Sequence, residues 1–394
     1  MDRPRILIVA GEASGDAHAA GVVRALRESG LEADFFGIGG PRLASEGMHM
    51  LANASQLAVV GIAEVLERLP KILALLRRIR SEIDRRPPDL FLPVDSPDFN
   101  FRLLSKASAR GVPVVYFIAP QLWAWRASRV RTLRERVREL LVLFPFEEPW
   151  FRERGVPATY VGNPLADEAR ARAAQRAQEH SSPGDAHGAA LLDNLSRATA
   201  HDEPPADYGL FLPGSRVVEI RHHLPVFALT ARMLRARGIA LRWLVRRAPG
   251  IDPEIYARHL ERGLLDASDE PLAGLAEQAR IVVSASGTAS LEAALTGTPL
   301  IVVYRMNPLT YQLVRRQVRV PHIAMANLTA GRRIVPEFVQ DECAPERLAG
   351  EIERLQVEGP ARSEMIRALN DLRASFGPPG AYARAAERVR AHLP

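Results

Sequence analysis

Cysteine is almost absent from this sequence. Cys343 is the only one among 394 residues, so the chain can form no internal disulfide and has no cysteine-based metal site. The histidines His180, His187 and His201 are too scattered to form a metal-binding motif. We therefore expect a protein that uses neither a metal nor another cofactor.

Long apolar stretches are also missing. No run of about 18 apolar residues occurs, so no transmembrane helix is expected. Residues 1–5 lead directly into the short apolar run 6–10, without the longer apolar core of a signal peptide. The sequence therefore predicts a cytoplasmic protein that is soluble or peripherally bound to a membrane.

The excess of one charge sign is small. Lys and Arg number 52 against 46 Asp and Glu, which gives a net charge of +6. This mild, arginine-rich excess suits phosphate-bearing substrates or an anionic membrane surface. Zinc-ligand spacing and an RNP-like aromatic motif are both missing, so we expect no nucleic acid partner.

Apolar residues, in contrast, are plentiful at 47%, and the chain is long enough for two domains. Short continuous apolar runs recur, and most lead into a turn and then a helical pattern. This alternation is typical of an α/β fold, in which parallel strands are buried on both faces of a sheet. The runs that we predict to be strands are 6–10, 89–94, 114–118, 140–144, 208–212, 241–245, 281–283 and 300–304.

The pattern fails between residues 166 and 207, where Ala, Arg, Glu and His are frequent and Pro204-Pro205 occurs. We interpret this segment as a linker or mobile insertion that is helical in part. It separates two Rossmann-like domains, residues 1–165 and 208–394, whose parallel sheets we expect to face a central cleft. The last helices, from Ala344 onward, could pack on either domain.

A candidate anion site lies in the second domain. The predicted strand 281–283 runs through Ser286, Gly287 and Thr288 into a predicted helix at 291–295. A helix that begins in this way presents free backbone N–H groups and the positive end of its dipole. Glu292, one turn inside, could accept hydrogen bonds from a ribose diol. The alternative is an ordinary helix capped by Ser286 or Thr288.

Two glycine-rich turns occur in the first domain. One spans Gly11–Asp16 after the first strand, and the other spans Gly37–Pro41. Neither matches G-x-G-x-x-G or G-K-[ST], so a dinucleotide and a P-loop triphosphate are disfavoured. Taken alone, the first favours a tight strand-to-helix turn over a binding site. Together they suggest a cleft lined by loops at the carboxyl ends of strands.

The run 89–94 ends in Asp95-Ser96-Pro97-Asp98-Phe99-Asn100. A carboxylate at this edge of a sheet could act as a general base toward a sugar hydroxyl. Alternatively, an aspartate here caps the predicted helix 99–109. We expect one of the two aspartates to be the cap and the other to be functional.

The run 114–118 leads to Trp123-Ala124-Trp125-Arg126. The two tryptophans could form the wall of a pocket for a sugar or an acyl chain, or they could pack a helix onto the sheet. A basic face, either solvated or suited to a phosphate or anionic lipid, is predicted from Arg126, Arg129, Arg131, Arg134 and Arg136.

A helix is predicted to begin at Pro70, with apolar residues at helical spacing and basic neighbours. It either packs on the sheet or meets lipid, and residues 57–66 before it are candidates for membrane contact and acceptor entry. The apolar positions are Ile72, Leu76, Ile79 and Ile83, and the basic ones are Lys71, Arg77, Arg78 and Arg80.

Together these motifs resemble the lipid-A-disaccharide synthase family, inverting glycosyltransferases of family 19 with the two-domain GT-B fold. The matching stretches follow the family's order over nearly the whole chain, at 11–16, 37–41, 95–100, 123–126, 212–216, 286–292, 304–308 and 327–332. The sequence departs from the family pattern at three places. Asn163 replaces the more usual His before Pro, Met325-Ala326 replaces Leu-Pro before Asn327, and the segment 166–207 is longer.

The resemblance implies a reaction in lipid A biosynthesis. The family transfers 2,3-diacylglucosamine from UDP-2,3-diacylglucosamine to the 6-hydroxyl of 2,3-diacylglucosamine 1-phosphate, known as lipid X. The products are UDP and the β(1→6)-linked lipid A disaccharide 1-phosphate, and the anomeric centre inverts in one displacement. The resemblance also implies peripheral association with the cytoplasmic side of the inner membrane, and it leaves a homodimer open.

The resemblance further suggests the residues that carry this reaction. Asp98 is expected to be the general base, with Asp95 orienting it or contacting the acceptor. Arg216 and the N–H groups around Gly287 are expected to stabilise the diphosphate without a metal, and Glu292 to hold the ribose. The remaining expected substrate contacts are Glu12, Ser14 and Asp16 on the acceptor side, Asn327 and Gln340 toward the donor, and Trp125, Arg126, Gly214, Ser215, Ser286, Thr288 and Asn307.

Two alternatives stay open at this stage. Another GT-B enzyme, such as a UDP-N-acetylglucosamine 2-epimerase or a transferase acting on lipid-linked peptidoglycan precursors, would share the nucleotide site without the other motifs. A non-catalytic module that binds nucleotide sugars would share it too, although intact Asp98 and Arg216 argue against that class.

Overall fold

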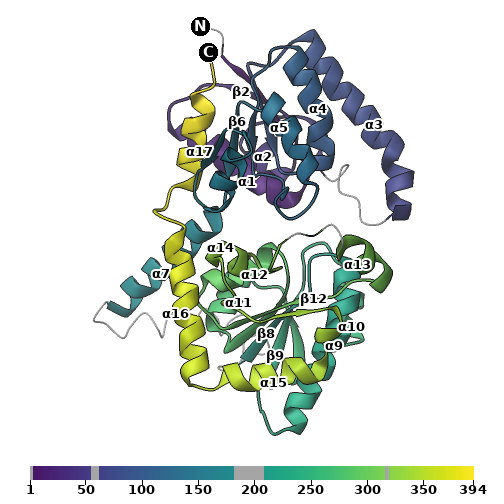
Figure 1. Ribbon diagram of the computed structural model, residues 1–394, viewed down its shortest axis with the longest axis vertical. Helices are drawn as coiled ribbons and strands as arrows, with labels where there is room; N and C mark the ends of the chain where they lie inside the picture. Colours follow the sequence, from purple (N-terminus) through teal and green to yellow (C-terminus); the bar gives the residue numbers. More distant parts are fainter. Residues whose placement is uncertain (1–2, 55–61, 182–207, 316–317, 319) are drawn as a thin grey trace. The chain divides into compact units, whose positions relative to one another are not determined.

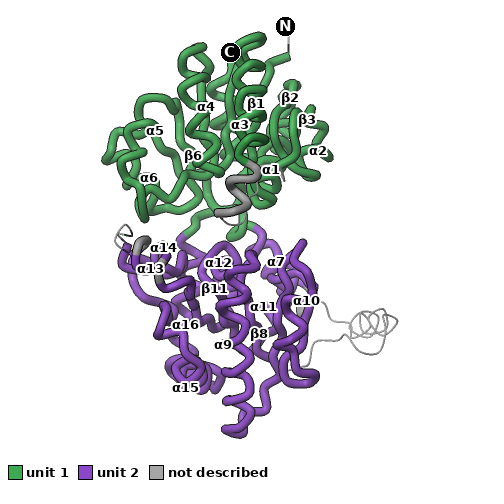
Figure 2. Tube along the Cα trace, turned by 90° about the vertical axis from the view of Figure 1, so that its right-hand side faces the viewer, with its two compact units in different colours: residues 1–167, 317–319, 376–394 green, residues 168–316, 320–375 purple. Residues whose placement is uncertain are grey.

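The computed structural model describes residues 3–54, 62–181, 208–315, 318 and 320–394. The chain forms two compact units, shown in Figure 2. Unit 1 contains residues 1–167, 317–319 and 376–394, and unit 2 contains residues 168–316 and 320–375. Of the expected linker, residues up to 181 belong to helix α7 (Pro164–Ser181), and residues 182–207 lie outside the described ranges.

Unit 1 is built on a seven-stranded parallel sheet with strand order β3-β2-β1-β4-β5-β6-β7. The apolar runs form its central strands because side chains on both faces are buried. The strands are β1 (Arg5–Ala10), β2 (Asp34–Gly39), β3 (His49–Asn53), β4 (Leu90–Val94), β5 (Val115–Phe117), β6 (Glu139–Val142) and β7 (Ala158–Tyr160). The helices are α1 (Ala13–Glu28), α2 (Pro41–Ser45), α3 (Ile62–Arg85), α4 (Pro97–Ala109), the 3-10 turn η2 (Ala127–Arg129), α5 (Val130–Arg136), α6 (Glu147–Arg152) and α17 (Ala381–Arg390).

Unit 2 repeats this design with a six-stranded parallel sheet of order β10-β9-β8-β11-β12-β13. Its strands are β8 (Tyr208–Leu212), β9 (Arg242–Arg246), β10 (Leu265–Ser268), β11 (Ile281–Ala285), β12 (Leu300–Tyr304) and β13 (Glu337–Val339). Its helices are most of α7, then α9 (Val217–Ala236), α10 (Glu254–Ala257), α11 (Leu272–Gln278), α12 (Thr288–Leu295), α13 (Pro308–Arg315), α14 (Met325–Ala330), η3 (Gln340–Glu342), α15 (Pro345–Gln356) and α16 (Pro360–Ser375).

Two parallel sheets confirm the predicted α/β class. In each sheet the strand order reverses beside the first strand, between β1 and β4 in unit 1 and between β8 and β11 in unit 2. Open α/β sheets bind ligands outside the carboxyl ends of the strands at such a switch point. The described helices include none that is long and apolar enough to cross a membrane.

Gly37 does not form the turn that the sequence suggested. Gly37, Ile38 and Gly39 are the last residues of β2, and the turn begins at Gly40. Gly37 has a φ of +143°, and a Cβ at this position would lie 1.9 Å from the carbonyl oxygen of Ile8 on β1. The close approach of the two strands therefore requires glycine here.

Helix α3 begins earlier than predicted. It starts at Ile62, and Pro70 lies inside the helix instead of opening it. Beyond Pro70 the apolar positions Leu76, Ile79 and Ile83 are buried while the basic neighbours are exposed, so the packing interpretation is confirmed for these residues. Of the segment proposed for membrane contact, residues 57–61 lie outside the described ranges.

The C-terminal helix α17 belongs to unit 1, where it packs against α1 (Figure 1). Ala385, Ala386 and Val389 are buried in the core of this unit. Gly21 on α1 makes the contact possible, because a Cβ there would lie 2.5 Å from the ring of Tyr382. The sequence had left open the domain on which the last helices pack.

Candidate active site

Two loops of unit 1 meet at the switch point between β1 and β4. The backbone N–H of Gly11 donates a hydrogen bond of 3.1 Å to the hydroxyl of Ser96, which joins the loop after β1 to the loop after β4. The structure thereby brings Glu12 into the neighbourhood of Asp95, and their carboxylates interact electrostatically.

Asp95 occupies a left-handed backbone conformation directly after β4, with a φ of +47° that is uncommon for a residue with a Cβ. Its carbonyl oxygen accepts hydrogen bonds from the Tyr116 hydroxyl at 2.6 Å and from Asn100 Nδ2 at 2.7 Å, which hold this conformation. Burial and then Glu12 raise the pKa of the Asp95 carboxyl to about 6. At neutral pH the carboxylate is therefore ionised yet basic enough to accept a proton in catalysis.

Asp98 has different surroundings. Its side chain is 67% exposed, and Oδ1 accepts hydrogen bonds from Arg126 at 3.0 Å and from Arg129 at 2.8 Å. Because Oδ1 of Asp98 is already occupied by two guanidinium groups, the geometry favours Asp95 as the base. The expectation that one of these aspartates caps α4 is wrong, because the N-cap is Ser96 and no side chain caps the helix there.

The two tryptophans have separate roles. Trp123 is buried, and its indole N–H donates to Glu147 Oε1 at 3.0 Å. Burial raises the pKa of the Glu147 carboxyl to about 7. Trp125 is 41% exposed, and the Arg126 guanidinium lies 4.4 Å from the centroid of its ring. Trp123 therefore anchors the loop, while Trp125 presents an apolar surface beside a cation.

The residues expected on the acceptor side divide into exposed and buried ones. Glu12 and Ser14 are exposed at the start of α1. Asp16 is only 2% exposed, and its carboxylate accepts three backbone N–H groups of the turn into α2, from Gly40, Arg42 and Leu43, at 2.6 to 3.1 Å. Asp16 thus fixes the start of α2, and its burial corrects the expectation that it lines a cleft.

In unit 2, residues 213–216 lead from β8 into α9. Gly214 has a φ of +123°, and a Cβ there would lie 2.6 Å from Glu219. The carboxylate of Glu219 accepts the backbone N–H groups of Ser215 and Arg216 and also the Arg216 guanidinium at 3.1 Å. Because the Arg216 side chain is 59% exposed, this guanidinium can turn from Glu219 toward an anionic ligand.

Ser286, Gly287 and Thr288 join β11 to α12 on the other side of this switch point. Gly287 is the N-cap, which corrects the capping alternative drawn from the sequence. No atom lies within 4 Å of a Cβ added to Gly287. Within the described residues, the N–H groups of Thr288 and Ala289 have no hydrogen-bond partner. The helix start is therefore open to an anion, whereas the Ser286 hydroxyl donates to Ile323.

Glu292 lies one turn inside α12 and is half-buried. Burial raises the pKa of its carboxyl, while the nearby guanidinium groups of Arg172 and Arg246 and the N–H of Ala273 lower it. These surroundings leave it able to accept hydrogen bonds from a diol.

A buried histidine connects two loops of unit 2. His223 on α9 has one ring nitrogen, Nδ1, 2.8 Å from the carbonyl oxygen of Pro213, and its Nε2 accepts the backbone N–H of Arg305 at 2.9 Å. These partners require the neutral ring with its proton on Nδ1. Burial lowers the pKa of His223, which favours that state. His223 thus ties the loop after β8 to the loop after β12.

The loop after β12 is held from its other side by Gln340, whose side chain bonds both the N–H and the carbonyl of Met306, at 2.8 and 3.1 Å. Asn307 follows on this loop, is exposed, and accepts the N–H of Thr310 at the start of α13. Gln340 therefore positions the loop, which is a different role from the direct donor contact that we expected.

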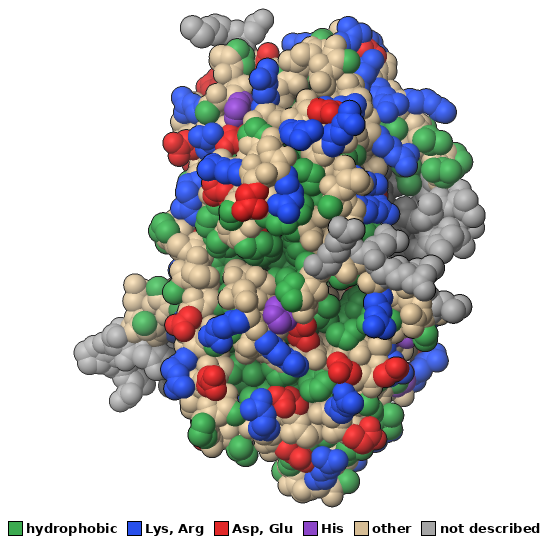
Figure 3. Space-filling view, in the orientation of Figure 1, with side chains coloured by type: hydrophobic (Ala, Val, Ile, Leu, Met, Phe, Trp, Pro, Cys, Tyr) green, Lys and Arg blue, Asp and Glu red, His purple; other side chains and the backbone are tan. Residues whose placement is uncertain are grey.

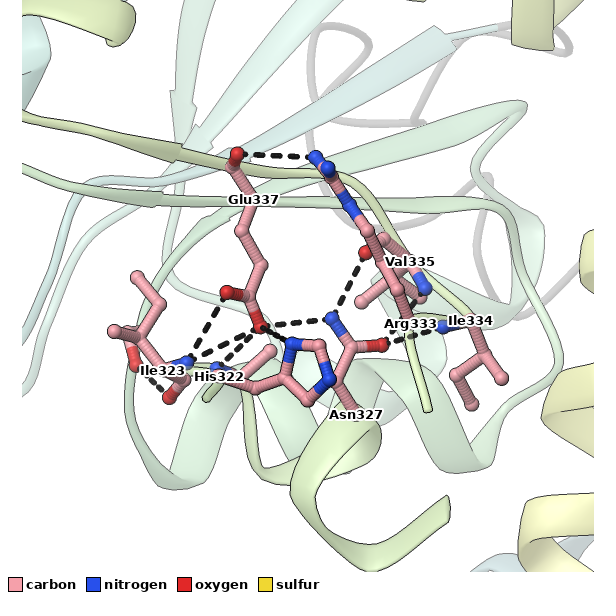
Figure 4. Close-up of polar contacts among 9 residues, drawn as sticks. His322, Ile323, Asn327, Arg333, Ile334, Val335 and Glu337 are labelled. Atoms are coloured by element: carbon pink, nitrogen blue, oxygen red, sulfur yellow. Dashed lines mark hydrogen bonds and ion pairs between the residues drawn. The ribbon is translucent and has the colours of Figure 1, made fainter. Parts of the chain in front are cut away.

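Asn327 is fully buried, so the expected contact with the donor is not available to it. Figure 4 shows its amide between Glu337 and the backbone of residues 334 and 335. Oδ1 accepts the N–H groups of Ile334 and Val335, and Nδ2 donates to Val335 and Glu337. Glu337 in turn accepts the N–H groups of Ile323 and Ala324. Asn327 therefore locks the segment between α14 and β13.

Sequence reasoning missed several residues of these sites. Tyr116, Glu147, His223 and Glu337 make contacts that the fold brings together, across 82 positions of the chain for His223 and Arg305. Glu219 instead contacts Ser215 and Arg216, four and three positions before it, so its place in the first turn of a helix was a local signal that could have revealed it. Ser96 lay inside a stretch that we had singled out, but no role was assigned to it. Arg129 was predicted only as part of a basic face, without its pairing with Asp98. No group of three or more His, Cys, Asp or Glu side chains suited to a metal ion occurs in the described part of the chain.

Sequence comparisons give one consistent result. A family model described as lipid-A-disaccharide synthetase matches residues 6–369. The lipid-A-disaccharide synthase of Myxococcus xanthus strain DK1622 is 42% identical, over 99% of this chain and 98% of that protein. A protein of the same name from Anaeromyxobacter dehalogenans strain 2CP-1 is 39% identical, over 98% and 96%.

Solved structures share the fold at low sequence identity. The glycotransferase of kitacinnamycin matches with a TM-score of 0.61 and 17% identity over all of both chains. The UDP-GlcNAc 2-epimerase from Neisseria meningitidis, bound to UDP-GlcNAc, matches with a TM-score of 0.62 and 12% identity over 98% of each chain. CalG4, the calicheamicin glycosyltransferase, matches with a TM-score of 0.58 and 16% identity over 100% and 98%. The predicted GT-B fold is confirmed.

Proposed function

This chain belongs to the lipid-A-disaccharide synthase family, and from that premise we propose how its residues carry out the reaction. The protein is a glycosyltransferase of lipid A biosynthesis. We propose that it transfers 2,3-diacylglucosamine from its UDP derivative to the 6-hydroxyl of 2,3-diacylglucosamine 1-phosphate. Unit 1 acts on the acceptor and unit 2 holds the UDP donor.

Asp95 is the general base of this proposal. Its carboxylate takes the proton of the acceptor 6-hydroxyl while that oxygen forms a bond to the anomeric carbon of the donor. The bond from the same carbon to UDP breaks, and the configuration inverts from α to β. The observation that carries this assignment is the pKa of Asp95, raised by burial on a rigidly held backbone.

The leaving UDP is stabilised in unit 2. The open N–H groups of Thr288 and Ala289 and the positive end of α12 suit a diphosphate, and Arg216 supplies an exposed guanidinium. Glu292 accepts hydrogen bonds from the ribose. His223 and Gln340 keep the surrounding loops in place.

Helix α3 supports the proposal that the enzyme binds peripherally to the cytoplasmic face of the inner membrane. Lys71, Arg77, Arg78 and Arg80 are exposed, and Leu69 beside them is a large exposed apolar side chain. Figure 3 shows Lys and Arg side chains along the side of unit 1 where α3 lies in Figure 1. Basic side chains beside an apolar one suit anionic head groups. Reversing the three arginine charges should weaken sedimentation with anionic vesicles, and unchanged sedimentation contradicts the proposal.

The experiment that tests the reaction measures UDP release by the purified protein in mixed micelles without divalent metal. The assay contains UDP-2,3-diacylglucosamine, with and without 2,3-diacylglucosamine 1-phosphate. We expect acceptor-dependent release and a disaccharide product. Release that is independent of the acceptor indicates a hydrolase or an epimerase. Bound UDP without release contradicts the transferase assignment and indicates a nucleotide-sugar-binding role.

A further inference from the structure

Two arginines of unit 1 converge on one exposed carboxylate close to the proposed base. Arg126 and Arg129 both donate to Oδ1 of Asp98, and all three side chains are at least 32% exposed. The loop and η2 present both guanidinium groups to the first turn of α4, three residues after Asp95. We propose that Arg126 and Arg129 form the binding site for the anomeric phosphate of the acceptor, with Asp98 as an exchangeable internal counter-ion.

Each of the two guanidinium groups lies over the face of an aromatic ring. Arg126 lies 4.4 Å from the centroid of Trp125, and Arg129 lies 5.4 Å from the centroid of Phe101. Stacking of this kind orders a guanidinium group while its N–H edge stays free to bind an anion. Arg126 also has a left-handed backbone with a φ of +54°. This arrangement is more ordered than expected for a purely solvated basic face.

The charge balance favours a phosphate over the carboxylate that is present. Two guanidinium groups and one carboxylate leave a net charge of +1, and Asp98 offers only one oxygen to both arginines. A phosphate monoester carries up to two charges and three terminal oxygens, so it can bind both arginines bidentately. An exposed carboxylate contributes little to stability through such ion pairs. A phosphate can therefore displace Asp98 at small cost.

The position also fits the acceptor. Tyr116 donates its hydroxyl proton to the carbonyl oxygen of Asp95 and interacts electrostatically with both Asp98 and Arg129. The arginine pair and the base are therefore grouped around one tyrosine within unit 1. Since the proposal for the donor diphosphate uses unit 2, the anion left for these arginines is the phosphate of the acceptor sugar. This inference rests on the proposed function.

The test compares two acceptors in neutral-detergent micelles, 2,3-diacylglucosamine 1-phosphate and 2,3-diacylglucosamine with a free anomeric hydroxyl. The variant Arg126→Ala/Arg129→Ala should lose about 10- to 100-fold in kcat/KM with the phosphorylated acceptor. It should lose much less with the unphosphorylated one, and the KM of the UDP donor should stay constant. Arg131→Ala is the matched control, because Arg131 lies on α5 and is ion-paired with Glu135.

Asp98→Asn provides a second, independent measurement. Removing the internal counter-ion should lower the KM of the phosphorylated acceptor severalfold without changing that of the unphosphorylated one. An Asp98 that acts as the base would instead lose turnover with both acceptors.

Three outcomes overturn the inference. An equal loss with both acceptors indicates a structural role for the arginines, and a rise in donor KM indicates that they bind the diphosphate. If the loss appears only when an anionic phospholipid is added to the micelles, the arginines bind membrane head groups. Failure of the proposed function is distinct, because the wild-type protein would then release no UDP in response to either acceptor.

Discussion

The turns beside the switch points of the two units use different kinds of residue. At the outer strands the pattern is mixed, since left-handed Gly162 follows β7 in unit 1 and left-handed Gln340 follows β13 in unit 2. In unit 1 the left-handed positions at the carboxyl edge of the sheet include Asp95, Ser96, Ile118 and Arg126, all of which carry side chains. In unit 2 the corresponding turns after β8 and β11 use Gly214 and Gly287. A strained residue with a side chain aims a functional group, whereas a glycine lets a ligand approach backbone N–H groups. Unit 1 thus presents functional side chains at its switch point, whereas unit 2 presents backbone N–H groups that suit an anion.

The largest effect on turnover should follow a substitution of Asp95, at the switch point of unit 1. Asp95→Asn keeps the shape but removes the base, so turnover should fall by about 10²- to 10⁴-fold. UDP affinity, measured by calorimetry, should be unchanged because the proposed donor site lies in unit 2. Since the pKa of Asp95 is raised to about 6, wild-type kcat/KM should rise with pH through that value. Asp98→Asn is the isosteric control, and a comparable loss of turnover there would return the base assignment to Asp98.

A smaller effect, on UDP affinity, is expected from a substitution of Gly287, at the switch point of unit 2. Gly287→Ala forces a Cβ onto a residue with a φ of +154°, a region that side-chain-bearing residues avoid at a cost of about 1–3 kcal/mol. The start of α12 should shift, and UDP affinity should fall by about tenfold. Gly350→Ala within α15 is the matched control in the same unit, since a Cβ there meets no atom within 4 Å. Equal UDP affinities for the two variants would show that the Gly287 turn does not bind the nucleotide.

The loops of unit 2 should respond to acid through His223. Protonation would place a proton on Nε2 against the N–H of Arg305, and burial lowers the pKa of this ring below its usual 6.5. His222 and Arg305 lower that pKa further, whereas the Pro213 carbonyl and Glu219 raise it. UDP affinity should therefore fall severalfold at a pH below the usual histidine range. His223→Gln should weaken binding at neutral pH and remove most of this acid dependence, while His259→Gln should leave it unaltered.

The smallest effect on activity is expected from a substitution of Glu147, the buried partner of Trp123 in unit 1. Burial raises the pKa of its carboxyl from the ordinary 4.5 to about 7, so between these pH values the folded chain keeps a proton that the unfolded chain has lost. The stability contributed by this group is fully present below 4.5 and is lost as pH rises through 7. Glu147→Gln should remove about 1–3 kcal/mol of this pH dependence. The thermal unfolding midpoints of the wild type and of Glu147→Gln, measured from pH 4.5 to 8, test the direction of this effect. If the difference between the two midpoints does not change in favour of Glu147→Gln as pH rises, the prediction is wrong.

Much of the fold was predictable because central strands of parallel sheets are continuous apolar runs. Residues 208–212 and 300–304 match β8 and β12 in full. Five strands were not among the predicted runs. One is β2, beside the edge strand β3, where the sequence suggested a glycine-rich turn. The other four, β3, β7, β10 and β13, are the edge strands of the two sheets. They have three to five residues and are only partly buried along their length. Short strands of this kind carry too little periodic signal to be recognised.

The sequence predicted which loops carry the residues of the candidate site, but it did not predict the role of each residue. Asp95, Arg216, Gly287 and Glu292 lie at the carboxyl edges where the motifs placed them. Whether a carboxylate is a base, a counter-ion or a structural group depends on contacts distant in sequence. Asp16 faces Gly40, Asp98 faces Arg126, and Asn327 faces Glu337. These pairings follow from the packing of elements, which no local pattern encodes.

The return of the chain to unit 1 has a consequence for protein synthesis. Residues 1–167 leave the ribosome first, yet α17, which covers Gly21 and completes the core of unit 1, lies within the last segment, 376–394. Unit 2 has all of its segments by residue 375. The domain that is begun first is therefore completed after unit 2, and the nascent chain holds an open apolar surface on α1 until residues 376–394 have been synthesised. Truncation near the C-terminus should consequently damage the N-terminal domain.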